Sequence, residues 1–278
     1  MHLALTIFPT EYAIAPDELA VAAEERGFES IWVAEHSHIP ASRETPWPGG
    51  TDLPQMYYDT MDPFVWLSVA AQATTTLKVA TGILLLVQRD PIHSAKSITT
   101  LDRLSNGRAI IGVGGGWNVE EMNNHGTQKE GRWKLLRERV EAMKTIWAEE
   151  QATYHGEHVS FDAIIQNPKP LQQPHPPIHV GGAPPGGLRR AIRYGNGWMP
   201  IMGRADDDVA ALAKALADAA TEAGRSRDEL ELSLFAAPGD PDFVKRAEEA
   251  GVDRLIFGLP PFGADQVLPL LDQLASLR

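Results

Sequence analysis

Residues 101–117 read LDRLSNGRAIIGVGGGW, and this stretch decides between two kinds of α/β fold. A dinucleotide-binding turn needs a third glycine three residues after the second, where helix and strand pack closely, and Trp117 stands in that place. The glycine cluster is therefore not that fingerprint. What remains is the end of a helical pattern, Gly107, an apolar strand and a flexible turn, followed by the acidic pair Glu120 and Glu121.

The same order of signals recurs along the chain. Asp-Pro pairs at 62–63, 90–91 and 240–241 predict helix starts, because aspartate caps free amide groups and proline suits the first helical position. Helical patterns end at glycine, and an apolar strand follows each of these glycines within a few residues. These glycines are at positions 27, 107, 195 and 251.

Short apolar strands alternate with helical patterns over the whole length, and no linker or low-complexity segment interrupts them. This alternation favours an α/β fold of the closed (β/α)8 type, the TIM barrel, over an open doubly wound sheet. Such barrels take ~250 residues as one unit, so we expect one domain over residues 1–278. The expected strands are 3–8, 30–34, 78–84, 108–113, 178–181, 197–201, 231–235 and 254–258. The expected helices are 16–26, 63–75, 91–105, 131–150, 187–194, 206–223, 241–250 and 264–277.

The composition is that of an ordinary globular protein, with 43% hydrophobic and 22% charged residues. No apolar run approaches the ~20 residues that span a bilayer, and the start lacks a signal pattern, so we expect a cytoplasmic protein with no membrane partner. The chain has no cysteine, which excludes disulfides and thiolate chemistry. A net charge of −12 repels polyanions and makes nucleic acid an improbable partner.

Two connections are unusually long. In a parallel barrel the functional face carries the loops that lead from strand to helix. Residues 35–61 form such a loop and are expected to wall a pocket on that face. Residues 151–177 follow a helix, so they belong to the opposite face, where we expect a small hairpin around Gly156 and no catalytic role.

Glycines are dense at the strand ends of the functional face. A strand end without side chains suits a broad planar ligand or a phosphate that approaches the backbone. For any one of these glycine pairs, a tight turn is the simpler explanation. The pairs and clusters are Gly82, Gly114 to Gly116, and Gly181 with Gly182.

Six blocks of sequence between the second strand and the sixth carry a family resemblance. With them the chain resembles the bacterial luciferase-like superfamily of barrels and, within it, the branch that uses the deazaflavin coenzyme F420. The blocks are WVAEH (32–36), DPF (62–64), ATGIL (80–84), LDRLSNGR (101–108), GVGGGW (112–117) with Glu121, and PIHVGG (177–182).

The resemblance implies a coenzyme site at the strand ends. A cis peptide bond at Gly82-Ile83 would form a bulge that supports the central ring of the coenzyme. His36 would lie beside that ring and either donate a hydrogen bond to it or shuttle a proton, and Glu35 stands where many relatives of this branch carry aspartate. We therefore name His36 and Glu35 as candidate catalytic residues. The expected cofactor contacts are Phe8, His36, Thr81, Gly82, Ile83, Gly114, Gly115, Gly116, Gly181, Gly182, Ala183 and Arg189.

The resemblance also implies that the phosphate and side chain of the coenzyme lie near the turn at 181–183. Amide groups at a helix start stabilise an anion. Arg189 and Arg190, together with Arg43 and Arg89, are candidates for the positive charge that the acidic protein otherwise lacks.

Two tryptophans on functional-face loops, Trp47 and Trp117, are expected to line an apolar substrate cavity. In sugar-phosphate dehydrogenases of the F420 branch, the resemblance implies a catalytic glutamate where this chain has Trp117. A role in glucose-phosphate oxidation is therefore disfavoured.

The preferred function is an F420-dependent oxidoreductase that moves a hydride between the coenzyme and a small organic substrate, and the family suggests a homodimer. An FMN-dependent monooxygenase that uses oxygen is the nearest alternative. A metal-dependent hydrolase would use the pair His36 and His38, but His179 is the only other strand histidine and the last strand ends without aspartate, so we expect no metal. A non-catalytic relative that only binds the cofactor stays open.

Overall fold

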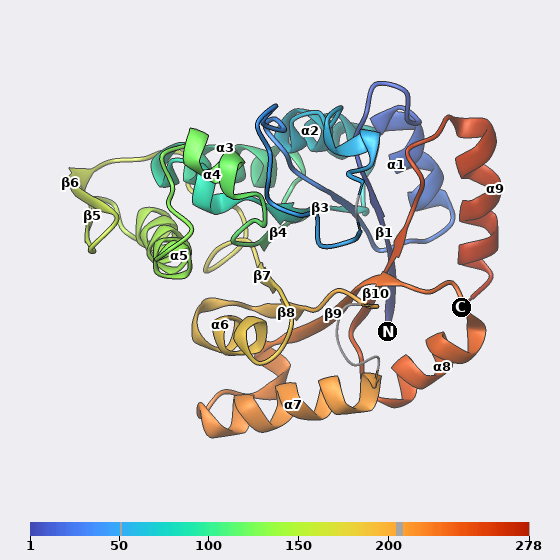
Figure 1. The fold of residues 1–278 in the computed structure, drawn as a ribbon. Coiled ribbons are helices and arrows are strands. Elements are labelled where there is room, and N and C mark those ends of the chain that lie inside the picture. Colours follow the sequence, from blue (N-terminus) through green and yellow to red (C-terminus); the bar gives the residue numbers. More distant parts are fainter. Residues whose placement is uncertain (51, 204–207, 278) are drawn as a thin grey trace.

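The eight expected strands pair as a closed parallel barrel in the computed structural model, which describes residues 1–50, 52–203 and 208–277. Their order around the barrel is β1-β10-β9-β8-β7-β4-β3-β2, and helices surround them (Figure 1). The barrel strands are β1 (His2–Ile7), β2 (Ser30–Val33), β3 (Lys78–Leu84), β4 (Ala109–Val113), β7 (Ile178–Gly181), β8 (Gly197–Met199), β9 (Glu231–Ala237) and β10 (Arg254–Gly258). The prediction of a TIM barrel is confirmed.

The expected helices are all present, with ends that differ by a few residues. Helix α7 was expected to begin at Asp206, which lies outside the described residues. The helices are α1 (Pro16–Glu25), α2 (Pro63–Ala73), α3 (Pro91–Leu104), α5 (Arg132–Ala148), α6 (Gly186–Tyr194), α7 (Val209–Glu222), α8 (Pro241–Glu249) and α9 (Ala264–Ala275).

Aspartate caps start the Asp-Pro helices, as the sequence predicts. The Asp62 carboxylate accepts hydrogen bonds from the amides of Phe64 at 2.8 Å and Val65 at 3.1 Å. Asp90 does the same for His93 at 2.8 Å, and Asp240 caps α8 in the same way. Each cap satisfies amide groups that have no partner inside the helix, so the start of the helix is fixed.

One helix was not expected. Helix α4 (Val119–Asn124) follows the glycine cluster, and the Asn118 side chain caps it by accepting the Glu121 amide at 3.3 Å. Six residues are too few for a helical period to show in the sequence. Short 3-10 turns at Gln55–Tyr57, Leu86–Gln88 and Arg227–Glu229 were missed for the same reason.

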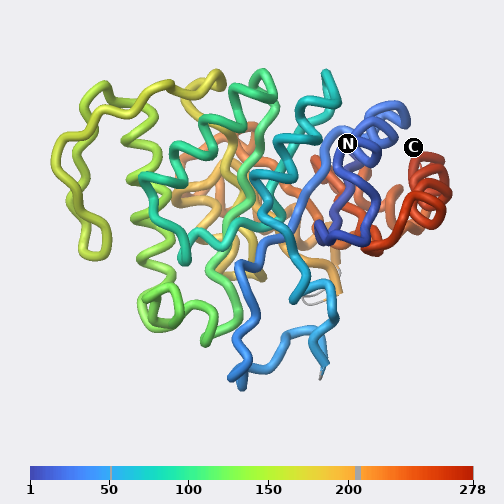
Figure 2. The backbone as a smooth tube through the Cα atoms, turned by 90° about the horizontal axis from the view of Figure 1, so that it is seen from above, coloured from blue at the N-terminus to red at the C-terminus, as the bar shows by residue number. Residues whose placement is uncertain are grey.

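The long connection after α5 forms the predicted hairpin, β5 (Ala152–His155) with β6 (Ser160–Ile164). It extends away from the barrel beside α5 (Figure 1), and the view along the other axis shows the same separation (Figure 2). The chain returns to the barrel through Asp102 of α3, whose carboxylate accepts the amides of Leu171 at 2.7 Å and Gln172 at 3.1 Å. Part of the block at 101–108 therefore anchors this connection.

The barrel interior holds a small apolar cluster made of Ala4, Trp32, Ala80, Ile110, Met199 and Ile256. The larger apolar core lies between strands and helices. No helix in the described ranges is long and apolar enough to cross a membrane.

At the amino end of the barrel a buried arginine pairs with two glutamates. The Arg254 guanidinium donates to both carboxylate oxygens of Glu29 at 2.9 Å and to Glu231 at 2.6 Å. His179 lies in the same layer, with its Nε2 3.4 Å from Glu231. In parallel barrels the amino ends of the strands contribute to stability, whereas catalytic residues lie at the carboxyl ends. We therefore interpret this network as structural.

Candidate active site

His36 lies at the carboxyl end of β2 and is 8% exposed. Its Nδ1 is 2.8 Å from the Glu121 carboxylate, which is completely buried on α4. The other carboxylate oxygen of Glu121 accepts the Ser37 amide at 3.2 Å. An ionised carboxylate only accepts hydrogen bonds, so we assign the Nδ1 proton to His36, and Nε2 is then the nitrogen that can exchange a proton with a ligand.

Glu121 contacts His36 but was not named as a candidate site residue from the sequence, although it belongs to a block that carries the resemblance. Its connection with His36 spans 85 residues and depends on α4, which the sequence did not predict. The Asn118 cap ahead of an acidic pair is the signal that indicates such a helix.

Aromatic rings surround His36, and Tyr57 contacts most of them. The ring centroid of Tyr57 is 5.2 Å from His36, 4.5 Å from Phe8 and 5.7 Å from Trp47. Trp117 lies 5.9 Å from His36. The structure therefore brings Phe8, Trp47 and Trp117 together with His36, as expected for one site. Tyr57, from the long loop after β2, was missed because a single tyrosine in a loop carries no pattern.

Glu35 points elsewhere and both of its oxygens are engaged. They accept the Arg89 Nε at 2.5 Å and the Leu85 amide at 2.6 Å, and Arg89 also donates to Asp62 at 3.0 Å. Burial raises the pKa of the Glu35 carboxyl, while Arg89 and the Leu85 amide act against that shift. This arrangement ties the ends of β2 and β3 to the start of α2, so the geometry fits a positioning role for Glu35, and its catalytic role stays a prediction. The Arg89 guanidinium pairs with the carboxylates of Glu35 and Asp62, so its charge is already compensated within the protein.

The peptide bond Gly82-Ile83 is cis, as the resemblance implies. The Ile83 side chain then lies between two glycines: a Cβ atom built on Gly114 would come within 2.0 Å of it, and one built on Gly181 would lie 3.4 Å from it. These glycines make room for a protein side chain, which in turn presents an apolar surface at the strand ends. Gly115 makes similar room for the Trp133 ring, at 2.4 Å from a built Cβ.

Thr81 is placed differently from the other expected contacts. It is completely buried, and its hydroxyl donates to the Gly112 carbonyl at 2.8 Å. This bond links β3 to β4 next to the Gly82-Ile83 bond, and Thr81 follows Ala80 of the interior cluster, so its side chain lies on the helix-facing side of the sheet.

The turn after β7 contains Gly182 at a φ of +125°, a conformation that glycine adopts far more readily than other residues. The Arg190 guanidinium lies over this turn, 3.2 Å from the Cβ position of Gly182. Ala183 of this turn and Arg189 of α6 are both exposed. Arg43 contacts the Trp117 ring at 5.9 Å, so it belongs to the aromatic group around His36.

His38 does not join His36. It pairs with Ser37 and Asn124, and Ser37 also bonds His125 at 2.7 Å. No group of three or more histidine, cysteine or acidic side chains arranged to hold a metal ion occurs in the part of the chain that the structure describes.

A family model described as luciferase-like monooxygenase matches residues 15–239. The chain belongs to this family. A relative from Mycobacterium tuberculosis, described as an uncharacterized protein, is 39% identical over 99% of this chain and 98% of its own length. An F420-dependent glucose-6-phosphate dehydrogenase of Kineococcus radiotolerans is 30% identical over 78% of this chain and 61% of its own length.

Solved structures of other proteins share the luciferase-like barrel fold. The F420-dependent tetrahydromethanopterin reductase of Methanopyrus kandleri superposes with a TM-score of 0.76 at 18% identity, over 99% of this chain and 97% of that one. A monooxygenase from Streptomyces bottropensis superposes with a TM-score of 0.79 at 21% identity, over 99% and 98%. At these identities the likeness concerns the luciferase-like fold.

Proposed function

We propose that this luciferase-like protein is an oxidoreductase that uses coenzyme F420 and transfers a hydride between it and a small organic substrate. The observation that carries the proposal is His36, buried at the end of β2, held by Glu121 and placed among aromatic rings. The F420-dependent dehydrogenase at 30% identity supports the choice of coenzyme, since its match covers 78% of this chain.

The residues at the strand ends fit a flat coenzyme. Ile83 presents an apolar surface between the ends of β4 and β7, and Gly258 at the end of β10 has open space where a Cβ would stand. Gln88, in the 3-10 turn after β3, and Asn118, the cap of α4, each carry a buried amide donor without a partner among the described residues. The Gln88 amide nitrogen lies 3.8 Å from the Cβ position of Gly116. Unpaired buried donors at a binding face suit a ligand with carbonyl oxygens.

When bound, the coenzyme supplies a carbon centre that takes up or gives up a hydride and does not activate oxygen. His36 takes the accompanying proton at Nε2 when an alcohol-like substrate is oxidised, or returns it in the reverse direction. Glu121 holds the ring so that Nε2 faces outward and stabilises the imidazolium that forms. Tyr57, Trp47 and Trp117 exclude water from the same space.

The first test is coenzyme binding. Fluorescence titration of the purified chain should give a dissociation constant for F420 well below that for FMN. An activity assay with F420 and a panel of alcohols, ketones and unsaturated carbonyl compounds should then show turnover of at least one compound. The variant His36→Ala should bind F420 and lose about a hundredfold or more in kcat, while His93→Ala, at an exposed position on α3, should keep full activity. An unchanged kcat for His36→Ala would remove histidine from the mechanism.

The family description favours one alternative, an FMN-dependent monooxygenase. The same barrel face would then bind reduced FMN. Tighter binding of FMN than of F420, together with oxygen consumption in the presence of reduced flavin, would establish this alternative instead. Tight F420 binding without turnover on any substrate would point to a non-catalytic relative.

We also propose a homodimer that uses α2. Val65 is 70% exposed and Val69 is 43% exposed one turn further along the same face. Adjacent exposed valines on one helix face suit burial against a second copy. Light scattering should give twice the monomer mass, and Val65→Glu should lower it; a monomeric wild-type chain would contradict this.

A further inference from the structure

Four aromatic side chains around His36 are only half-buried. They are Phe8, Trp47, Tyr57 and Trp117, and we call them the aromatic group. Two other tryptophans, Trp32 and Trp198, pack in the core and are completely buried. The aromatic group instead keeps apolar surface exposed at the functional face, beside the histidine that exchanges a proton in the proposed function.

The Trp47 ring is held in place by two neighbours. It meets the Tyr57 ring edge to face, with the ring centroids 5.7 Å apart. The chain then turns back beside it: the Gly50 amide donates to the Trp47 carbonyl at 3.2 Å, and a Cβ atom built on Gly49 would come within 2.4 Å of the ring. Any side chain at position 49 would therefore displace the Trp47 ring from its contact with Tyr57.

Three neighbouring loops add to this apolar surface. Strand β1 lies between β2 and β10, and the loops after these strands are joined by backbone hydrogen bonds. The Met61 amide donates to the Pro9 carbonyl at 2.7 Å, and the Ile14 amide donates to the Phe262 carbonyl at 2.8 Å. Large aromatic or apolar side chains are exposed on all three loops, namely Tyr12, Tyr58, Met61 and Phe262. Exposed apolar surface gathered in this way indicates contact with an apolar ligand.

The same three loops are acidic. Residues 8–15, 35–61 and 259–263 contain five acidic residues and one arginine, Arg43. Of the acidic residues, Glu35 is compensated by Arg89, and the remaining four still outnumber Arg43. The Arg43 guanidinium lies 5.9 Å from the centre of the Trp117 ring and donates to a backbone carbonyl at 2.6 Å. This side of the functional face therefore disfavours an anionic substrate.

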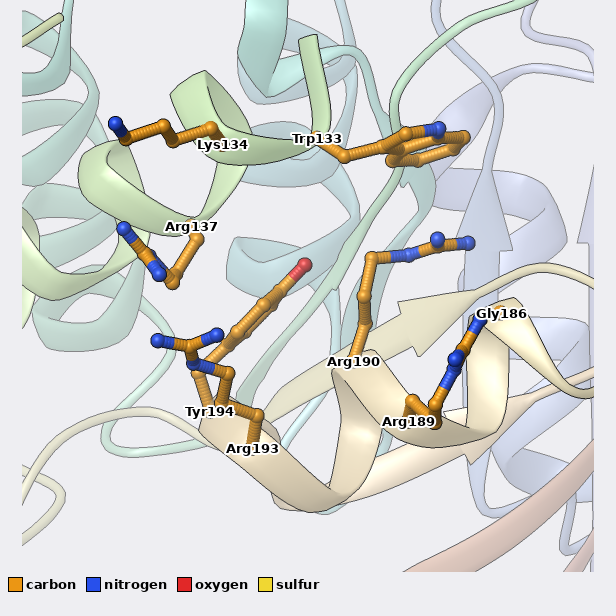
Figure 3. Close-up of a pocket in the computed structure, with 8 residues that line it drawn as sticks. All are labelled: Trp133, Lys134, Arg137, Gly186, Arg189, Arg190, Arg193 and Tyr194. Carbon is orange, nitrogen blue, oxygen red and sulfur yellow. The ribbon is translucent and has the colours of Figure 1, made fainter. Parts of the chain in front are cut away.

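The opposite side of the face has the reverse charge. Strand β7 lies four strands from β1 in either direction around the barrel, and α6 follows β7. A groove between α5 and α6 encloses a cavity of about 440 Å³ and is lined by Arg189, Arg190 and Arg193 (Figure 3). The family resemblance implies that the phosphate of the coenzyme lies on this basic side. The substrate then belongs to the aromatic side, where it meets rings and carboxylates.

We propose that the substrate is an uncharged secondary alcohol, or the corresponding ketone, whose body is an apolar ring, and that Trp47 determines this selection. The inference rests on the proposed function, since it names the substrate class of the same reaction. The carbon that bears the hydroxyl gives its hydride to the oxidised deazaflavin coenzyme, and the hydroxyl proton passes to His36 Nε2, so the alcohol becomes a ketone and the coenzyme is reduced. The substrate ring covers the exposed surface of the aromatic group.

The experiment compares three secondary alcohols on the F420-loaded chain. Cyclohexanol has the ring, isopropanol lacks it, and the third compound is cyclohexanol with a carboxylate on the ring carbon opposite the hydroxyl. Isothermal titration calorimetry gives the dissociation constants, and the absorbance of the oxidised coenzyme gives kcat/KM. We expect cyclohexanol to bind about tenfold or more tightly than either of the other two. The penalty on the carboxylate should shrink at high salt, because salt screens its repulsion by the acidic loops.

Two variants test the role of Trp47. Trp47→Ala should weaken cyclohexanol binding about tenfold and leave the affinities for isopropanol and for F420 within about twofold of the wild type. Gly49→Ala keeps every aromatic side chain but displaces the Trp47 ring, so it should weaken cyclohexanol binding about threefold. Ile165→Ala is the control, because it removes an exposed apolar side chain just after β6, and it should bind all three alcohols like the wild type.

The outcomes separate the two proposals. Failure of cyclohexanol to bind better than isopropanol, or an equal loss of both in Trp47→Ala, overturns the inference while the proposed function stands. Tighter binding of the carboxylate compound that is lost in Arg43→Gln would assign the site to an anionic substrate and also overturn it. A loss of F420 affinity in Trp47→Ala would place Trp47 on the coenzyme instead. If F420 does not bind the wild type, the proposed function itself fails, and the coenzyme titration shows this without any alcohol.

Discussion

The barrel contains two buried histidines beside glutamates, one at each end, and they serve different purposes. His36 lies at the carboxyl end with Glu121 2.8 Å away and aromatic rings around it. His179 lies near the amino end, completely buried, with Glu231 at 3.4 Å and the Arg254 guanidinium in the same network. The contrast teaches that a histidine–glutamate pair does not by itself define a catalytic site.

The surroundings make the difference. Burial and the charge of Arg254 lower the pKa of His179 to about 4, so this ring stays neutral. Arg254 already neutralises Glu231 and Glu29, and it lowers the pKa of both carboxyls, although burial acts against that shift. The Glu121 carboxylate accepts from His36 and from the Ser37 amide, and the site around His36 contains aromatic rings in place of further charges. The histidine at the amino end therefore belongs to a charge network, whereas the histidine at the carboxyl end pairs with one carboxylate among aromatic rings.

The largest effect is expected at Arg254. Replacing it with methionine keeps an unbranched stem and removes the charge, which leaves the buried Glu29 without its main partner. We expect the free energy of unfolding to fall by about 4 kcal/mol, measured by urea denaturation. Lys78→Met is the control, since Lys78 contacts the same carboxylate at 2.8 Å but is 40% exposed, and it should cost less than about 1 kcal/mol. Equal losses for both variants would mean that burial does not set the strength of this network.

The second effect concerns pH. The folded pKa of His179 lies below its unfolded value, so the folded state disfavours its protonation. The resulting stability is fully present above about pH 6.5 and is lost as the pH falls toward the folded pKa, with a total on the order of 3 kcal/mol. In His179→Gln, the free energy of unfolding should change less between those two pH values. His93→Gln, at a side chain 92% exposed, should keep the wild-type slope; an unchanged slope in His179→Gln would assign the loss to other groups.

The smallest of the three effects is expected at Glu121. Glu121→Gln keeps an acceptor for His36 and removes the negative charge that stabilises the imidazolium. We expect kcat to fall about tenfold with little change in KM, and the pH profile of kcat to move toward lower pH. Glu120→Gln is the matched control, because the Glu120 carboxylate contacts the amides of Glu44 and Thr45 instead. A fall in kcat without any movement of the pH profile would leave Glu121 with a purely structural role.

Much of the barrel could be predicted because its signals are local. An aspartate before a proline caps its own helix, and Gly27, Gly107 and Gly251 take positive φ at helix ends where other residues are strained. Each strand is a short apolar run that stays apolar wherever it pairs. These properties do not depend on distant residues, so they are visible in the sequence.

The candidate site was only partly predictable. His36 and Trp117 were expected at one face and lie 5.9 Å apart, because strand ends of a parallel barrel meet there. The bond Gly82-Ile83 is cis, as the resemblance implied. Glu121 and Tyr57 were missed, since each reaches His36 through a short helix or 3-10 turn without a periodic pattern. Gly114 and Gly115 were predicted to leave room for the cofactor at the strand ends. In the structure, the side chains of Ile83 and Trp133 fill the space beside these glycines.

The sequence by itself determined the barrel and which strand ends share one face, because hydrophobic period, caps and glycines act over a few residues. The family followed from six blocks of sequence that carry a resemblance. Only the tertiary structure decided which histidine–glutamate pair lies among aromatic rings, that Glu35 pairs with Arg89, and that Arg189, Arg190 and Arg193 line one groove without an ion pair to another described residue. Those facts depend on side chains that lie far apart along the chain and meet only when the barrel closes, where burial sets the strength of each charge.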